Sequence, residues 1–246
     1  MTLDSKSYGI KYNNRHSSDF DLKVLNTKVI GMPAKKKVTI NLPYSNNIVD
    51  LSSIYGKTKF SERVLEVDLR AENHSTQNKE LLYHRWTEII NWLMEPDGKT
   101  ILVDDVMSNY YYLAEVADAP TWEEYANSGD IKIKFNCYPF RIHAELEGND
   151  IWDIFDFDLD VAQETKMSVT GSKTIMQIND GAAEIQPTIV CDADFTVTLG
   201  GYTYQLTAGT FDSENAAYPL TLAVGENLIT ITGTGHIEFK WHKELI

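Results

Sequence analysis

The 246-residue chain is long enough for one large or two ordinary domains, and its 43% hydrophobic content allows a sizeable core. The formal net charge of -14 is unevenly spread: residues 1–145 carry 18 basic and 20 acidic side chains (net -2), and residues 146–246 carry 4 and 16 (net -12). The C-terminal part therefore repels nucleic acid, whose binding requires phosphate neutralisation. Its acidity suits solubility, or a basic or neutral partner.

Two cysteines occur, Cys137 and Cys191, in what look like different domains. Isolated cysteines without a secretory signal are more often reduced and buried than paired. Residues 1–10 contain no apolar signal region, and no apolar run approaches the roughly 18 residues that span a bilayer. We therefore expect a soluble protein that folds in a reducing cytoplasm, with no membrane insertion.

The first seventy residues have the pattern of short strands separated by polar turns. Alternation of period two in Val38–Leu42, which Pro43 closes, and in Arg63–Arg70 predicts two half-buried strands. The run Lys35-Lys36-Lys37 is interpreted as a solvated turn rather than a binding patch. Shorter strands are predicted at Tyr8–Tyr12, Leu22–Leu25 and Val29–Ile30.

An amphipathic helix is predicted over residues 75–94. Ser75 or Thr76 would cap its N-terminus, and Pro96-Asp97-Gly98 would end it. Its sheet-packing face is defined by apolar side chains at spacings of four, three and four: Leu82, Trp86, Ile89 and Leu93. The aromatics Trp86 and Trp92 are interpreted as core or flanking residues that need no ligand.

Three strands follow the predicted helix, at Thr100–Val103, Tyr110–Val116 and Ile131–Cys137. Residues 104–109 form the turn of an antiparallel hairpin between the first two. Asp104 and Asp105 lie in this turn without recognisable ligand spacing, so we predict no metal site there. An antiparallel sheet with one packed helix is therefore expected in a first domain, residues 1–145.

A connection rich in acids follows, comprising Arg141–Leu146 and Ile151–Leu159. A strand in the second segment would place Asp156, Asp158 and Asp160 on one face, where calcium is conceivable. The spacing lacks the glycine and closing glutamate of an EF-hand loop. A solvent-facing strand edge is the preferred interpretation, because charges discourage edge-to-edge pairing.

The remaining chain shows no helical period and predicts a β-sandwich in a second domain, residues 146–246. Seven short strands are predicted between glycine or asparagine turns: Thr174–Ile178, Thr188–Val190, Phe195–Leu199, Tyr202–Leu206, Leu220–Leu222, Leu228–Thr232 and His236–His242. His236 and His242 would stand about 20 Å apart along an extended strand, too far to share a metal ion.

No motif for catalysis or cofactor binding is present. The sequence has no glycine-rich phosphate loop, nucleophile elbow, His-Glu-x-x-His motif or zinc-ligand spacing. Its six histidines are scattered without a serine or cysteine in motif context. We expect a non-enzymatic protein with no catalytic residues, no cofactor and no metal, and assign no ligand-binding residue.

Several segments, in this order and spacing, resemble the distal tail protein family of siphophages. The matching N-terminal segments are Tyr8-Gly9-Ile10, Ser18-Asp19-Phe20, Phe60 to Val67, Trp92-Leu93 before Pro96-Asp97-Gly98, Leu102 to Asp105, Tyr112 to Val116, and Phe135 to Phe140. The C-terminal ones are Asn179-Asp180-Gly181, Pro187-Thr188-Ile189 and Leu222 to Asn227.

The resemblance implies a structural baseplate hub at the virion tail tip, assembled in the host bacterial cytoplasm. The first domain, β-barrel-like with one helix, would form a hexameric ring that continues the tail tube channel, through which DNA would pass without a nucleic-acid-binding site. The second, a galectin-like sandwich, would carry the host-attachment apparatus. Implied partners are the tail tube protein, the tail-associated tip protein and receptor-binding or baseplate proteins.

Two alternatives remain open on the sequence. The C-terminal sandwich could be a carbohydrate-binding module for cell-wall adhesion, with an aromatic side chain as the platform: Tyr202, Tyr204, Tyr218 or Trp241. The chain could also be a tail-tube subunit of related fold, which would polymerise into long tubes.

Overall fold

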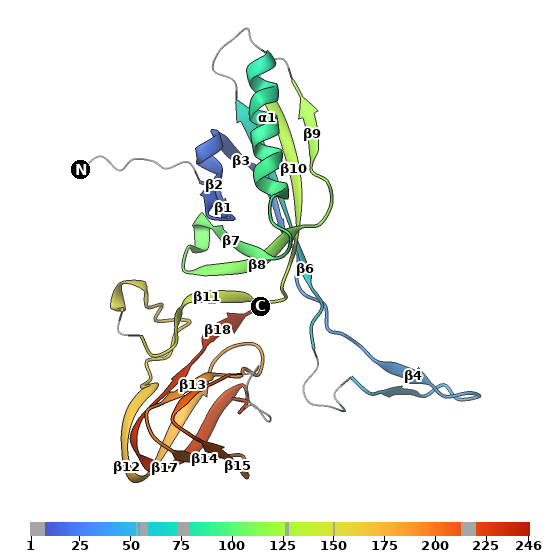
Figure 1. Cartoon of the computed structure of the whole chain (residues 1–246). Coiled ribbons are helices and arrows are strands. Elements are labelled where there is room, and N and C mark those ends of the chain that lie inside the picture. Colours follow the sequence, from blue (N-terminus) through green and yellow to red (C-terminus); the bar gives the residue numbers. More distant parts are fainter. Residues whose placement is uncertain are drawn as a thin grey trace. The chain divides into compact units, whose positions relative to one another are not determined.

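The chain is mainly β with one α-helix in its described part, and it divides into two compact units (Figure 1). The computed structural model describes residues 8–52, 54, 59–72, 79–125, 128–149, 151–212 and 220–246. Unit 1 comprises residues 1–141 with Ile246, and unit 2 comprises residues 142–245. The predicted fold class, antiparallel β with a single helix, is confirmed.

Unit 1 is built on an antiparallel sheet with the strand order β2-β1-β7-β8-β10-β6-β3, and β9 pairs with β10. Its longest pairing joins β6 and β10 over ten residues, from Arg63↔Cys137 to Glu72↔Ser128. A bulge between Val24 and Lys28 interrupts β3 but leaves it one strand, where two were predicted. The strands are β1 Ile10–Tyr12, β2 Arg15–His16, β3 Leu22–Ile30, β6 Arg63–Glu72, β7 Thr100–Asp104, β8 Tyr110–Val116, β9 Thr121–Glu124 and β10 Ser128–Cys137.

Helix α1, Lys79–Met94, packs its apolar face on this sheet. Leu82, Ile89 and Leu93 are buried as the spacing predicted, and the helix ends before Pro96. Trp92 is also buried, and its indole N–H donates to the carbonyl oxygen of Tyr12 at 2.8 Å. Trp86 is partly buried and packs on the Trp122 ring. The predicted start at residues 75–78 lies outside the described residues.

A hairpin of β4 Thr39–Asn41 and β5 Ile48–Asp50 extends from the unit 1 sheet between β3 and β6 (Figure 1). We call residues 31–62 the arm. The predicted strand at Val38–Leu42 is present, but its predicted half-burial is wrong, because all six residues of β4 and β5 are exposed. Isolated two-stranded hairpins are marginally stable at best.

Unit 2 contains a curled sheet with the order β15-β14-β17-β13-β16, and β12 pairs along β17. Its inward side chains form one core cluster, which includes Phe239, Trp241 and Ile231. The strands are β12 Lys166–Asn179, β13 Thr188–Cys191, β14 Phe195–Leu199, β15 Tyr202–Leu206, β16 Gly209–Phe211 and β17 Gly225–Lys240. β18 His242–Leu245 pairs with β11 Arg141–Leu146.

Two glycines make β17 a single strand where the sequence predicted two. Gly233 and Gly235 have φ values of 153° and 152°, which side chains rarely adopt. A Cβ on Gly233 would lie 2.5 Å from the Phe195 ring, and one on Gly235 would lie 2.4 Å from Asp192 Oδ1. Both positions therefore require glycine, because a side chain would collide with residues 192–195 packed against them.

Two strand predictions in unit 2 are wrong. Residues 151–160 form a 3-10 turn, Trp152–Ile154, and a second turn instead of a strand. Backbone N–H groups donate to the carboxylates there, from Asp156 to Asp160 and from Asp158 to Asp156, which stabilises turns. Leu220–Leu222 makes only an isolated bridge between Leu222 and Ile185.

Candidate functional site

The root of the arm is anchored by a buried arginine. Arg63 is 3% exposed, donates from Nε to the carbonyl oxygen of Gly31 at 2.8 Å, and lies over the Tyr112 ring. Backbone bonds from Gly31 to Val64 and from Ser61 to Ala34, both 2.8 Å, extend the β3–β6 ladder into the arm. The backbone pairing of β3 and β6 therefore continues into the root of the arm.

The outer part of the arm has one apolar face. Ile40 stands opposite Val49 in the β4–β5 register, and Val38 and Leu42 lie on the same side of β4. Their exposed fractions are 56% for Val38, 50% for Ile40, 43% for Leu42 and 38% for Val49. A strand with this alternation normally buries its apolar side. We call these four residues the arm face.

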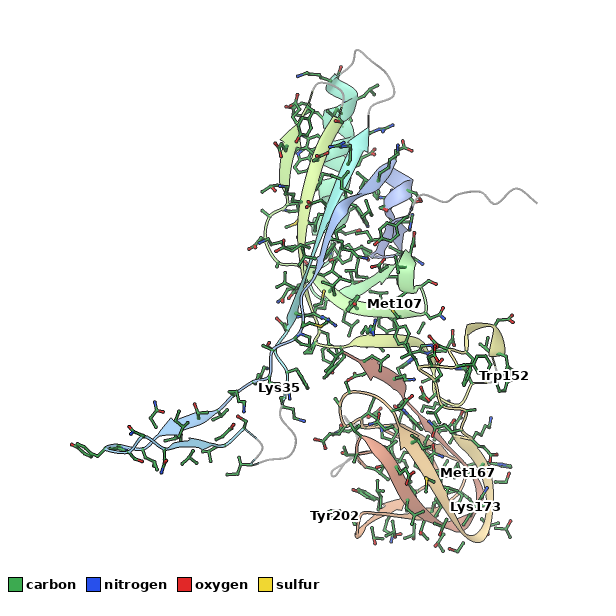
Figure 2. The ribbon with its side chains drawn as sticks, turned by 180° about the vertical axis from the view of Figure 1, so that it is seen from behind. Lys35, Met107, Trp152, Met167, Lys173 and Tyr202 are labelled. Carbon is green, nitrogen blue, oxygen red and sulfur yellow. The ribbon has the colours of Figure 1, made fainter. Side chains whose placement is uncertain are left out.

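Lysines surround the root of the arm. Lys35, Lys36 and Lys37 are exposed, and Lys35 bridges to Phe60 through the backbone (Figure 2). Lys37 Nζ lies 2.6 Å from Asp50 on the facing strand. Such an exposed ion pair contributes little stability, so this part of the arm remains polar and solvated.

Hydrogen bonds from neighbouring residues hold the Asp104–Asp105 turn of unit 1 in place. Asp104 receives hydrogen bonds from the Tyr8 hydroxyl and the Lys28 ammonium, and Asp105 receives one from the Gly9 N–H at 2.9 Å. Because neighbouring donors satisfy both carboxylates, the turn has an explanation without an ion. No group of three or more metal-ligating side chains occurs in the described parts of the chain.

Unit 2 contains a buried lysine that binds two carboxylates. The Lys243 side chain is fully buried, and its Nζ lies 2.9 Å from Asp160 and 2.6 Å from Asp180. It also donates to the Leu159 carbonyl oxygen. These contacts fasten the turn at residues 151–160 to β18, beside a pocket that Glu147 and Trp152 help to line. The sequence did not indicate this pocket, because its lining, which lies between His143 and Gln163, carries no recognisable motif.

The aromatic residues proposed for sugar binding are not brought together. Trp241 is 4% exposed and belongs to the core, and Tyr204 packs against that core. Tyr202 is 72% exposed at the end of β15 (Figure 2). Tyr218 lies outside the described residues. A shared aromatic platform from this set is therefore absent among its described members.

The histidines at the ends of the last predicted strand have separate roles. His236 Nδ1 and Ser168 Oγ are 2.9 Å apart, whereas His242 Nδ1 lies 3.0 Å from the His143 carbonyl oxygen. They do not share a site. No helix in the described part is long and apolar enough to cross a bilayer.

No family model and no curated protein matches this chain. Among solved structures, the Dit protein (gp 19.1) of SPP1 matches with a TM-score of 0.65 and 14% identity, over 96% of this chain and 99% of that one. That protein is described as a paradigm of the hub adsorption apparatus in phages that infect Gram-positive bacteria. The present chain therefore has a Dit-like, β-rich fold.

Proposed function

We propose that the chain is a structural hub protein of a siphophage tail, forming a hexameric ring that joins the tail tube to the host-recognition apparatus. The likeness of fold to SPP1 Dit over nearly the whole chain supports this role. The observation that carries the proposal is the arm face, which has the pattern of a buried strand but is exposed in a single chain.

In the proposed ring, the arm face of each subunit packs on its neighbour. Fully burying a valine, leucine or isoleucine side chain stabilises by about 1.5–3 kcal/mol, and the four residues of the arm face are between 38% and 56% exposed. Completing their burial would therefore contribute about 1 kcal/mol each. Closed rings repeat one heterologous interface, and six such contacts require an element that reaches the next subunit. An anchored arm meets this requirement.

The two units take different roles in this proposal. Unit 1 forms the ring and meets the tail tube protein on one side and the tail-associated tip protein on the other. Unit 2, with galectin-like architecture, carries receptor-binding or baseplate proteins. Its acidic charge suits basic or neutral protein partners and disfavours nucleic acid. The protein then acts at the virion tail tip as a component, without catalysis.

The test is the mass of the purified full chain by light scattering after size exclusion, with negative-stain images of the same peak. The hub proposal predicts closed rings of six times the 27.9 kDa chain mass. Long tubes would favour a tail-tube subunit instead. A monomer at every concentration, with and without the tube and tip proteins, would contradict the proposal.

A further inference from the structure

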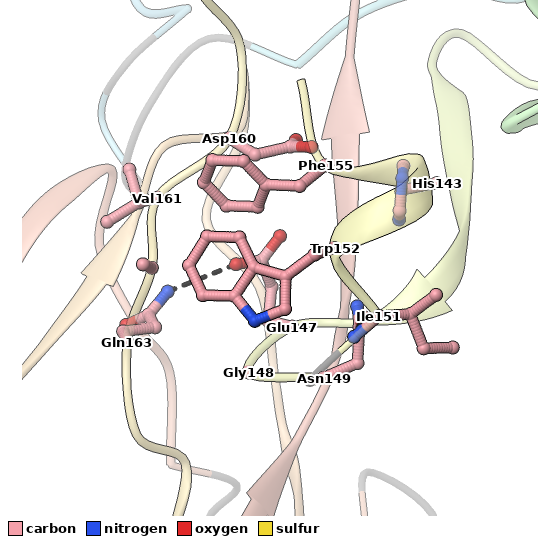
Figure 3. A pocket seen from close by; sticks show the side chains of 11 residues that line it. His143, Glu147, Gly148, Asn149, Ile151, Trp152, Phe155, Asp160, Val161 and Gln163 are labelled. Carbon is pink, nitrogen blue, oxygen red and sulfur yellow. Dashed lines mark hydrogen bonds between the residues drawn. The ribbon is translucent and has the colours of Figure 1, made fainter. Parts of the chain in front are cut away.

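The pocket in unit 2 combines aromatic rings with carboxyl groups (Figure 3). It has about 570 Å³ of empty space, part of it open to solvent. The Trp152 and Phe155 rings line it with centroids 5.3 Å apart, and Trp152 is 65% exposed. Glu147 and Asp160 provide its acidic part. Aromatic side chains with a few polar groups are the usual lining of small-molecule pockets.

Glu147 has an unused acceptor in this pocket. The residue is 8% exposed, and Gln163 donates to its Oε2 at 3.1 Å. The other oxygen, Oε1, has no hydrogen-bonding partner among the described residues. This oxygen is not among the buried polar atoms of the described residues that lack a partner, so it is open to solvent in the pocket and can accept from a donor or face a cation there.

The charges near Glu147 favour a cation. Asp160 and Asp180 both lie close enough to act on it electrostatically, and Lys243 is the ammonium group between them. Three carboxyl groups therefore face one lysine, with the His143 ring also lining the pocket. The C-terminal part of the chain adds a strong negative field, since residues 146–246 carry 16 acids and 4 bases.

The side-chain amides of the pocket already form most of their hydrogen bonds with other groups of the same chain. Gln163 donates to Glu147 and to the Ile178 carbonyl oxygen, and its own carbonyl accepts from the Ile178 N–H. Asn149 donates to the Leu146 carbonyl oxygen and accepts from the Ile151 N–H. Sugars are recognised by several free donors and acceptors, and these two amides offer few. The groups that remain available to a ligand are the face of an aromatic ring and one carboxyl oxygen.

We propose that this pocket binds an organic cation of the quaternary ammonium class, with the Trp152 ring against its methyl groups and Glu147 against its charge. Aromatic rings attract such cations through their negative faces, and tryptophan is the strongest of them. The methyl groups fill apolar surface, which a small hydrated metal ion would not do. This site is independent of the ring, so it can be tested whether or not the chain assembles.

The experiment is equilibrium dialysis of the full chain with labelled choline, which works for a monomer or a ring. We expect saturable binding with a Kd of roughly millimolar strength. The neutral isostere 3,3-dimethylbutan-1-ol and the disaccharide cellobiose should not displace choline. Trp152→Ala and Glu147→Gln should each weaken binding about tenfold. Tyr202→Ala, which removes an equally exposed aromatic outside the pocket, should bind as the wild type does.

Three results would overturn the proposal: no saturable choline binding, equal displacement by the neutral isostere, or unchanged binding by both pocket variants. Displacement by cellobiose that Trp152→Ala abolishes would reassign the pocket to sugar. Unfolding curves of both variants show whether they are folded, and the Glu147→Gln variant removes only a charge. Phosphatidylcholine vesicles in the same assay identify the source of the bound cation. If the vesicles displace labelled choline at equal headgroup concentration, the ligand is a lipid headgroup. If they do not, the ligand is a free or polymer-borne cation.

Discussion

The ammonium group of Lys243 lies 2.9 Å from Asp160 Oδ1, and no part of the lysine side chain is exposed. Burial alone lowers the pKa of Lys243, but hydrogen bonds to Asp180 and Asp160 raise it overall. The lysine is therefore charged in the folded protein. Through this contact the last strand of unit 2 holds the turn that carries Trp152 and Phe155.

Replacing this lysine should destabilise unit 2 strongly. Lys243→Met keeps most of the volume but leaves Asp160 and Asp180 without their cation, which costs about 3–5 kcal/mol for a buried pair. Urea unfolding measures the change. The matched control is Lys240→Ala, whose partly exposed pair with Glu238 should contribute less than about 1 kcal/mol. Equal losses in the two variants would contradict a special role for Lys243.

Glu147 should make stability depend on pH. Burial raises the pKa of Glu147, and the Gln163 hydrogen bond only partly opposes this. A carboxyl with a raised folded pKa contributes its stability below the unfolded pKa and loses it as pH rises through the folded pKa. Glu147→Gln should therefore be more stable than the wild type at pH 8 and equally stable at pH 4. A variant that is less stable at pH 8 would show that the carboxylate is favourable there.

Both cysteines should be unreactive in the native protein. Burial raises the pKa of Cys137 to about 12 and also raises the pKa of Cys191. The reactive thiolate is therefore scarce at pH 8, and both residues are buried and unpaired. A thiol reagent should label neither residue before unfolding and both in denaturant. Rapid labelling of the native chain, or labelling that requires a reductant in denaturant, would contradict this.

Local patterns in the sequence predicted the elements whose periodicity is set by neighbouring residues. The spacing of Leu82, Ile89 and Leu93 identified the buried helix face, and alternation located β8, β14 and β15 with their observed bounds. The buried role of Trp92 was less evident, since it depends on the carbonyl oxygen of Tyr12, eighty positions away. Contacts at such separations leave no periodic signal.

The wrong predictions have specific physical causes. Alternating polarity suggested a strand at residues 151–159, but aspartate side chains there bind nearby backbone N–H groups and favour turns. Gly233 and Gly235 suggest a turn in the sequence, but they lie inside one strand, where the absence of a side chain lets residues 192–195 approach the backbone closely. The pocket could not be predicted, because the residues that position Glu147 and Gln163 are distant in sequence: the Glu147 N–H donates to the Trp241 carbonyl oxygen, and Gln163 bonds to Ile178.

The arm shows a second property that the sequence alone does not predict. Its alternation correctly predicted a strand with one apolar side, yet no sequence pattern states whether that side is covered by the same chain or by another. The exposed fractions of Ile40 and Val49 show that, within the described single chain, it is not covered. In the hub proposal, the neighbouring subunit covers this apolar side of the arm.

A charge on the arm face tests this account most directly. Ile40→Asp would place a carboxylate in the proposed subunit contact, whereas Asn41→Asp places the same charge on the opposite side of β4. Burying an unpaired charge is costly, so only the first substitution should prevent assembly. Neither should unfold the single chain, because both positions are exposed.

The decisive measurement is the light-scattering mass of the wild type and these two variants at equal concentration. We predict six times the 27.9 kDa chain mass for the wild type and for Asn41→Asp, and the mass of one chain for Ile40→Asp. A ring that persists unchanged in Ile40→Asp would contradict the role of the arm face.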